Sequence, residues 1–179
     1  MPIRLEIVTP EKAVYADDVD MVIAPASEGY VGILPHHAPL LTTLGPGEFR
    51  VKKGGVEEVL AVFGGFMDVR GDRVIVLTEA AEPAEEIDTQ RAQEARDRAQ
   101  EVLQAGPVSA AEEARARASL QRALVRIRVS ERRRRRLQRL VLLNGPFGAR
   151  TALTMWRSLT GANTLTPTRS GPWSSGVVE

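Results

Sequence analysis

The sequence predicts an α+β protein in which an antiparallel β-sandwich (residues 1–86) precedes a helical αα-hairpin (87–144) and a disordered tail (145–179). Three observations support this prediction. Short apolar runs with turn signals fill the first part, and helical patterns fill the second. The last part is rich in Ser, Thr, Gly and Pro and has no periodicity, which is typical of disorder.

Alternation and turn signals predict the sandwich. Residues 3–9 (IRLEIVT) alternate apolar and polar side chains, the period of a half-buried strand. A second apolar run, VDMVIAP, follows, and several more lie between residues 48 and 78. No helical pattern interrupts these runs, so we do not expect a parallel βαβ sheet. Two hairpin turns are expected, at Gly54-Gly55 and Gly71-Asp72.

Capping signals define two helices. Asp88 can cap a helix that ends before Gly106-Pro107. Ser109 and Glu112 form a capping box that opens a second helix, which ends at Asn144 before Gly145-Pro146. A break this short makes the two helices antiparallel neighbours.

Alanine dominates the predicted contact between these helices. Alanine permits close approach but buries little apolar area, so we expect a lightly held hairpin that can open. The residues expected to face one another are Ala92, Ala95 and Ala99 on the first helix and Ala111, Ala114 and Ala118 on the second.

Composition limits the classes of protein. The chain is 43% apolar but only 4% aromatic, so the core must consist of Val, Ile and Leu. It has no cysteine, which excludes disulfides and thiolate metal sites. No stretch approaches the roughly 20 apolar residues that cross a bilayer, so we expect any membrane association to be peripheral.

The charge is divided between the halves. Residues 1–87 carry 7 Lys/Arg against 15 Asp/Glu, a balance of −8, and residues 88–179 carry 17 against 8, a balance of +9. Such asymmetry suggests two segments with different partners.

Two adjacent histidines, His36 and His37, are the only ones in the chain. Without a third His or any Cys they do not make a metal site, and exposed loop residues are the plainer interpretation. Ser27 lies near them but lacks the sequence context of a nucleophile, and the Gly-rich pieces lack phosphate-loop spacing. We therefore expect no active site of the chain's own and no metal.

The run Arg132–Arg136 leaves an alternative function open. Clustered guanidinium groups neutralise phosphates, so a nucleic-acid-binding protein with a β-sandwich domain is the second candidate. No aromatic residues interleave with the run for base stacking, which favours a solvated face or an acidic protein partner instead.

The order of four segments resembles the epsilon subunit of F-type ATP synthases, whose mitochondrial counterpart is called delta. The segments are SEGYVGILPHHAPLLTTLGPG, FGGFMDVRGDRVIVLTEAAE, EEIDTQRAQEARDRAQE and LQRALVRIRV, and the resemblance covers residues 1 to about 136. It implies a sandwich of about ten strands in a non-catalytic rotor subunit. That subunit lies in the central stalk, at the cytoplasmic face of the bacterial cell membrane, and couples proton flow to ATP synthesis. The implied partners are the gamma subunit, the c-subunit ring and the catalytic beta subunits, with the membrane reached only indirectly and no nucleic acid.

The resemblance also assigns contacts. In the family, the loop that matches residues 28–37 rests on the c ring, which here gives Glu28, Tyr30, His36 and His37. The family's helices either fold against the sandwich or extend toward an acidic segment of the catalytic head and restrain ATP hydrolysis. The cations that would meet that segment are Arg115, Arg117, Arg128, Arg132, Arg133, Arg134, Arg135 and Arg136.

Some bacterial members bind one regulatory ATP through a motif I/L-D-x-x-R-A and further arginines, although no cofactor is required. The arginines on each helix share a face, because they are spaced by seven or four residues. Together they could neutralise a triphosphate. The matching residues are Ile87, Asp88, Arg91, Ala92, Arg98, Arg122 and Arg126.

Overall fold

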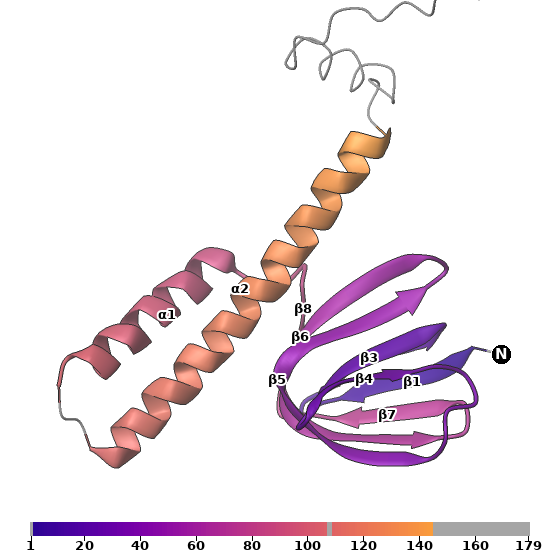
Figure 1. Ribbon diagram of the computed structural model, residues 1–179, viewed down its shortest axis with the longest axis horizontal. Coiled ribbons are helices and arrows are strands. Elements are labelled where there is room, and N and C mark those ends of the chain that lie inside the picture. The colour runs from indigo at the N-terminus through magenta and orange to yellow at the C-terminus, as the bar shows by residue number, and fades with distance from the viewer. Residues whose placement is uncertain (1, 107–108, 145–179) are drawn as a thin grey trace, which may run out of the picture. The chain divides into compact units, whose positions relative to one another are not determined.

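The computed structural model describes residues 2–106 and 109–144 of the chain. Residues 145–179, for which the sequence predicts disorder, lie outside the described residues. Residues up to Arg136 form one compact unit, and the account below concerns that unit. The elements, in order, are β1 (Ile3–Val8), β2 (Ala13–Val19), β3 (Met21–Ala26), β4 (Gly29–Ile33), β5 (Leu40–Lys53), β6 (Val56–Arg70), β7 (Arg73–Leu77), β8 (Ala81–Pro83), α1 (Thr89–Gln104) and α2 (Ala110–Asn144), as Figure 1 shows.

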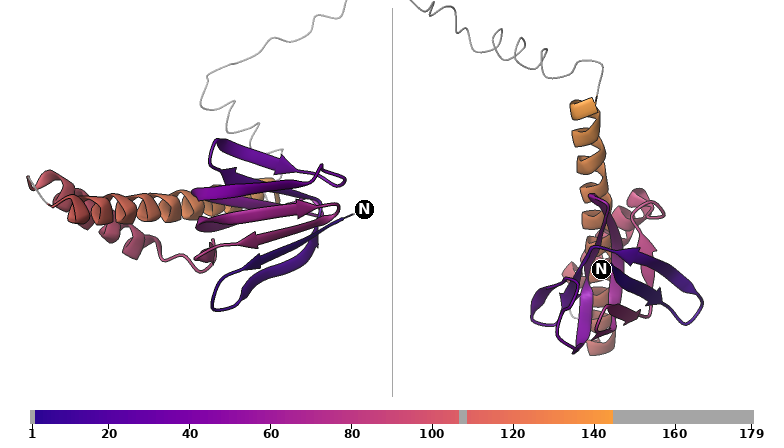
Figure 2. Two further views of the ribbon diagram at one scale, coloured as in Figure 1. Left: turned by 90° about the horizontal axis from the view of Figure 1, so that it is seen from below. Right: turned by 90° about the vertical axis from the view of Figure 1, so that its right-hand side faces the viewer.

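The strands form one sheet in the order β2-β1-β7-β6-β5-β3-β4, with β8 beside β6. The sheet folds over into two layers along the long strands β5 and β6 (Figures 1 and 2). We call one the helix-side layer; it contains β3, β4 and β8 with the 46–53 part of β5 and the 56–63 part of β6. The opposite layer contains β1, β2 and β7 with the 40–44 part of β5 and the 65–70 part of β6.

The expected count of about ten strands is wrong, because the described chain forms eight. The physical reason is that β5 and β6, of 14 and 15 residues, each continue through the fold and serve both layers. The antiparallel prediction is correct for every described pair except β1 with β7, which run parallel.

Two glycines make the fold-over possible. The pairing of β5 with β6 skips one step, between Leu44↔Gly65 and Pro46↔Phe63. Gly64 and Gly65 adopt φ values of 86° and 118°, which side chains rarely tolerate. A Cβ on Gly65 would also lie 2.0 Å from the backbone oxygen of Leu77. The bend of β6 therefore requires glycine.

The predicted hairpin turns are confirmed. Gly54 and Gly55 connect β5 to β6 with φ values of 56° and 77°, the pair of positive values that a type I′ turn needs. Gly71 and Asp72 connect β6 to β7 in the same position as expected.

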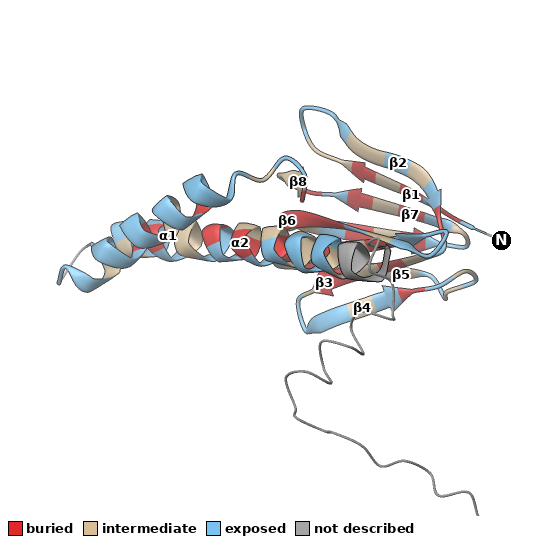
Figure 3. Ribbon diagram, turned by 90° about the horizontal axis from the view of Figure 1, so that it is seen from above, coloured by how far each residue is buried: buried red, intermediate tan, exposed pale blue. Residues whose placement is uncertain are grey.

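Strand β6 is buried on both faces from Val59 to Phe63. Leu60 and Val62 point into the core between the layers, with Phe49, Val51 and other aliphatic residues. Val59, Ala61 and Phe63 point outward and pack against Val125 and Val129 of α2. Figure 3 shows α2 passing over β6. Burying each large aliphatic side chain contributes about 1.5–3 kcal/mol, so this contact seats the helix on the helix-side layer.

The helix caps are as predicted. The Asp88 carboxylate accepts the Arg91 backbone N–H at 3.0 Å, which opens α1. At α2, Glu112 N–H donates to the Ser109 hydroxyl at 3.2 Å, and the Glu112 carboxylate accepts from Ser109 in return. These hydrogen bonds from Ser109 lower the pKa of Glu112.

The alanine contact differs from the prediction. Ala92, Ala99 and Ala116 are buried, but Ala111 and Ala114 are exposed. The reason is that α2 divides its small residues between two partners. Ala116 lies in the groove beside α1, whereas Ala118 lies beside Phe63 of the sandwich.

Substituting Gly65 with Ala tests the bend. We expect Gly65→Ala to lower the free energy of unfolding by about 3 kcal/mol or more, since both its backbone conformation and the Leu77 carbonyl oppose a Cβ. Gly45→Ala is the control, because an added Cβ there meets no atom within 4 Å. Urea unfolding of the two variants decides the matter; equal stabilities would contradict this account of the bend.

Candidate functional site

The side of α2 that faces the sandwich carries arginines held by sandwich carboxylates. Arg126 donates from Nε and Nη2 to Glu82 at 2.8 and 2.6 Å, a two-point contact, and its guanidinium lies 4.7 Å from the centre of the Phe63 ring. The hydrogen bonds to Glu82 raise the pKa of Arg126. This pair is half-buried and fixes α2 against β8.

Three more such contacts, made by two arginines, lie further along α2. Arg132 donates to Glu48 of β5 at 3.1 Å and to Glu57 of β6 at 3.2 Å. Arg133 lies 3.4 Å from Glu85. The first two arginines of the Arg132–Arg136 run, predicted to meet the catalytic head, are therefore engaged within the molecule.

The remaining basic residues predicted for the head contact fall into two groups, those with a contact in their own helix and those without a carboxylate partner. Arg117 and Arg135 pair with Glu113 and Glu131 of their own helix. Arg128 donates to a backbone oxygen of α2 at 3.4 Å. Within the described residues, no ion pair joins a carboxylate to Arg115, Arg134 or Arg136, so these side chains are available to a partner.

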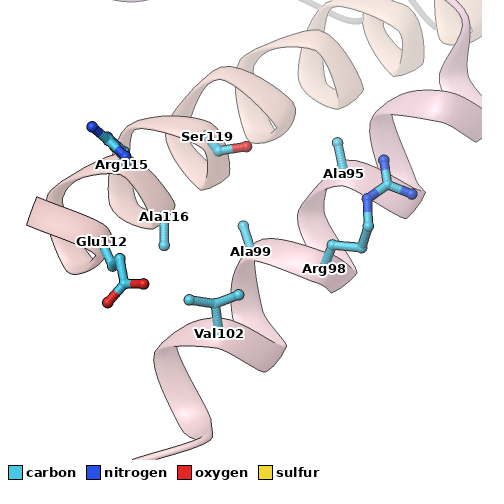
Figure 4. Close-up of a pocket in the computed structure, with 8 residues that line it drawn as sticks. All are labelled: Ala95, Arg98, Ala99, Val102, Glu112, Arg115, Ala116 and Ser119. Carbon is cyan, nitrogen blue, oxygen red and sulfur yellow. The ribbon is translucent and has the colours of Figure 1, made fainter. Parts of the chain in front are cut away.

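The residues predicted to bind ATP fall into separate places. Arg122 and Arg126 line one hollow of about 150 Å³ with Phe63, where α2 meets the sandwich. Arg98 instead lines an open groove of about 420 Å³ between α1 and α2, which Arg115 lines from the other helix (Figure 4). Arg98 also lies 3.8 Å from Glu94.

Three of the four other predicted residues have structural roles near the start of α1. Asp88 caps the helix, Ala92 is buried, and Ile87 packs beside the apolar cluster under α2. Arg91 is exposed. The structure thus brings Arg122 and Arg126 together and leaves Arg98 in a different hollow.

The predicted c-ring residues do not form one loop. Between Glu28 and His36 the chain forms the edge strand β4, so Tyr30 and His36 lie near opposite ends of it. Five strand residues span about 13 Å. Tyr30 lies near Gly47 and Arg50 of β5.

The histidines lie at the end of the sandwich that carries the β6–β7 turn. His36 has a left-handed backbone (φ 63°), and its N–H donates to the Asp72 carboxylate at 3.1 Å. His37 Nδ1 lies 2.7 Å from the Ala38 oxygen. These contacts fix the backbone of the turn while the His36 ring is exposed to solvent.

Sequence reasoning missed an apolar patch on the outer face of the opposite layer. We define the patch as Leu41, Phe66 and Leu77, whose exposed fractions are 72%, 55% and 54%. Phe66 lies directly opposite Leu77 in the pairing of β6 with β7, beside a hollow of about 680 Å³. The sequence did contain a signal for this patch. Apolar residues occupy both alternating positions along β6 and β7, so apolar side chains lie on both faces of these strands.

Neither a metal-binding cluster nor a membrane-spanning helix occurs in the described part of the chain. It contains no group of three or more His, Asp or Glu side chains that could hold a metal ion. No helix among the residues described is long and apolar enough to cross a membrane.

Two family models match this chain, one over the sandwich and one over the helical hairpin. The model of the ATP synthase Delta/Epsilon chain β-sandwich domain matches residues 2–84, and that of the long α-helix domain matches residues 85–131. The ATP synthase epsilon chain of Dehalococcoides mccartyi strain BAV1 is 49% identical over 136 residues, which cover 76% of this chain and 97% of the relative. That of Herpetosiphon aurantiacus is 50% identical over 76% of this chain and 99% of the relative.

Solved structures agree in fold. A chain of the Euglena gracilis mitochondrial ATP synthase structure, titled OSCP/F1/c-ring, superposes with a TM-score of 0.63 at 25% identity, over 69% of this chain and 78% of that one. A chain of the Tetrahymena thermophila mitochondrial ATP synthase central stalk and c ring gives 0.52 at 13% identity, over 73% and 97%, and supports the fold alone.

The β-sandwich, the helical hairpin and the two domain matches agree with one another. The chain therefore belongs to the Delta/Epsilon chain family of ATP synthase. Its resemblance to the epsilon subunit is confirmed. It is a non-catalytic, rotor-stalk subunit of an F-type ATP synthase, a membrane-associated complex. About a quarter of the chain has no counterpart in these relatives, because their alignments cover 76% of it.

Proposed function

We propose that this subunit joins gamma to the c-subunit ring at the cytoplasmic face of the bacterial membrane, and that its hairpin restrains ATP hydrolysis by the catalytic beta subunits. The observation that carries the stalk role is the apolar patch of the opposite layer, on a sandwich whose helix-side layer is already covered by α2. The family assignment makes this stalk role, and not nucleic-acid binding, the conclusion.

The apolar patch is the proposed binding site for the gamma subunit. Exposed large apolar side chains that lie together mark protein contacts, and the hollow beside Phe66 can accept a partner side chain. The patch lies on rigid strands, which suits a permanent contact.

The histidine end is the proposed contact with the c ring. Glu28 and Tyr30 can reach the same ring only if the edge strand β4 lies along its surface, since they are separated from His36 and His37 by the length of that strand. The backbone hydrogen bond between His36 and Asp72 gives this end a fixed shape.

The gamma contact is tested by Phe66→Ser with Leu77→Ser in the full chain. We expect affinity for purified gamma to fall about ten-fold or more, because central apolar anchors dominate binding energy. Val56→Ser is the control, since Val56 is also exposed but lies at the distant Gly54-Gly55 turn. Biolayer interferometry with immobilised gamma measures the effect; a patch variant that binds like the control would refute the assignment.

The hydrolysis restraint is tested by Arg134→Ala with Arg136→Ala. These arginines have no carboxylate partner within the described residues, so their removal should leave the fold unchanged and weaken attraction to an acidic segment of the head. We expect ATP hydrolysis by the assembled complex to rise, with a smaller difference at high salt because screening weakens the attraction in the unaltered complex. Unchanged hydrolysis at low salt would exclude a role for this pair.

ATP is the proposed regulatory ligand of the folded hairpin. The pairing of Arg122 with Arg126 in one hollow supports it, although Arg126 must exchange Glu82 for phosphate and the hollow of about 150 Å³ must widen. ATP bound there would stabilise the folded hairpin by linkage.

Calorimetric titration of the full chain with ATP tests this ligand. We expect binding heat from the unaltered chain and little from Arg122→Ala, while Arg117→Ala, an exposed arginine on the same helix, should bind as before. Equal heats from all three chains at millimolar ATP would remove Arg122 from the site.

A further inference from the structure

We propose that the helix-side layer is an ionic latch for α2, in which glutamates of the sandwich occupy arginines that the catalytic head would otherwise bind. The latch is defined by four contacts: Arg126–Glu82, Arg132–Glu48, Arg132–Glu57 and Arg133–Glu85. This inference rests on the proposed restraint of ATP hydrolysis and names its regulation.

The spacing of the arginines suits a single docking face. Arg126 and Arg133 are seven residues apart, which is two helical turns, and Arg132 is adjacent. Their carboxylate partners come from three different parts of the sandwich: β5, β6 and the segment around β8. The partners are separated by 44 residues for Arg126 and by up to 84 for Arg132. Pairs of such long range do not stabilise α2 as a helix; they hold it on the sandwich.

The latch adjoins a small apolar contact. Only Val125 and Val129 of α2 join the cluster with Val59, Ala61 and Phe63, so docking has a limited hydrophobic component. Beyond Val129, neither apolar cluster includes a residue of α2, and α2 is joined to the sandwich by the ion pairs of Arg132 and Arg133. The C-terminal part of the docked segment therefore depends on charge.

The carboxylates around Arg132 are partly shielded from water. The Glu48 and Glu57 side chains are 15% and 27% exposed, so their attraction to Arg132 is screened less than that of a surface pair. Arg132 also satisfies both carboxylates at once, which makes it the central residue of the latch.

A guanidinium group that is held by the sandwich glutamates cannot at the same time bind an acidic segment of the head. While Arg132 and Arg133 contact the sandwich, they are withheld from an acidic segment of the head. Of the run Arg132–Arg136, Arg134 and Arg136 then remain without a carboxylate partner among the described residues. Sandwich and head therefore compete for α2, and weakening one partner favours the other. Removing a sandwich glutamate should then affect hydrolysis in the opposite direction to removing an arginine.

The first measurement follows docking in the isolated full chain. The chain has no cysteine, so spin labels can be placed at Glu11→Cys on the sandwich and Leu124→Cys on α2, both exposed sites. We expect Glu48→Gln with Glu57→Gln to raise the undocked fraction about five- to ten-fold in pulsed dipolar distance distributions, as the loss of one or two partly shielded pairs implies. Raised salt should have the same effect on the unaltered chain.

Two control variants test whether a change in the distance distribution is specific to the residues of the latch. Glu58→Gln removes the same charge from the next position of β6, whose side chain points to the other face of the strand. Arg134→Gln removes an arginine next to the latch. Both should leave the distance distribution unchanged, whereas Arg132→Gln should broaden it as the double glutamate variant does.

The second measurement is ATP hydrolysis by the assembled complex. Glu48→Gln with Glu57→Gln should lower hydrolysis, because more α2 is released to the head, while Glu58→Gln should not. If the double variant undocks α2 but hydrolysis does not fall, the latch stands and the proposed restraint fails. If the distance distribution of the double variant equals that of Glu58→Gln, the latch itself is refuted, whatever the hydrolysis rate.

Discussion

Strand β6 connects the surface that binds α2 to the apolar patch, because its residues from Val59 to Phe63 are buried on both faces before it continues into the opposite layer. Leu60 and Val62 complete the core between the layers, and Val59, Ala61 and Phe63 seat α2 on the outside. After the bend at Gly64 and Gly65, the same strand enters the opposite layer and presents Phe66 to solvent. One continuous strand thus carries both the residues that contact α2 and Phe66 of the apolar patch, so these two surfaces are fixed relative to each other.

The opposite charges of the two halves have a structural explanation. The acidic sandwich and the basic hairpin do not only face different partners, since part of each charge neutralises the other along α2. Glu48 and Glu57 would be costly to leave half-buried without a cation, and Arg132 supplies one for both. Charge balance over the whole chain conceals this internal pairing, whereas charge counted by segment indicates it.

Local patterns predicted the local elements. Alternation predicted β1, the pairs Gly54-Gly55 and Gly71-Asp72 predicted the two hairpin turns, and capping residues predicted the helix starts, because each signal depends on residues close in sequence. The count of about ten strands, which the resemblance implied, was too high because β5 and β6 each continue through the bend as one strand. The ion pairs of Arg132 could not be predicted, since they join positions up to 84 residues apart, and periodicity alone does not say that Phe66 faces outward.

The passage of β5 and β6 through both layers has a mechanical consequence. In a sandwich held together by side chains alone, a sideways force on one layer is resisted only by packing, which is soft to sliding. Here two neighbouring strands carry the force across as covalent chain, and their mutual hydrogen bonds run almost without a break from Leu40–Val69 to Lys53–Val56. A subunit that transmits torque between two partners benefits from these continuous paired strands, because the layers cannot slide past each other without stretching the backbone itself.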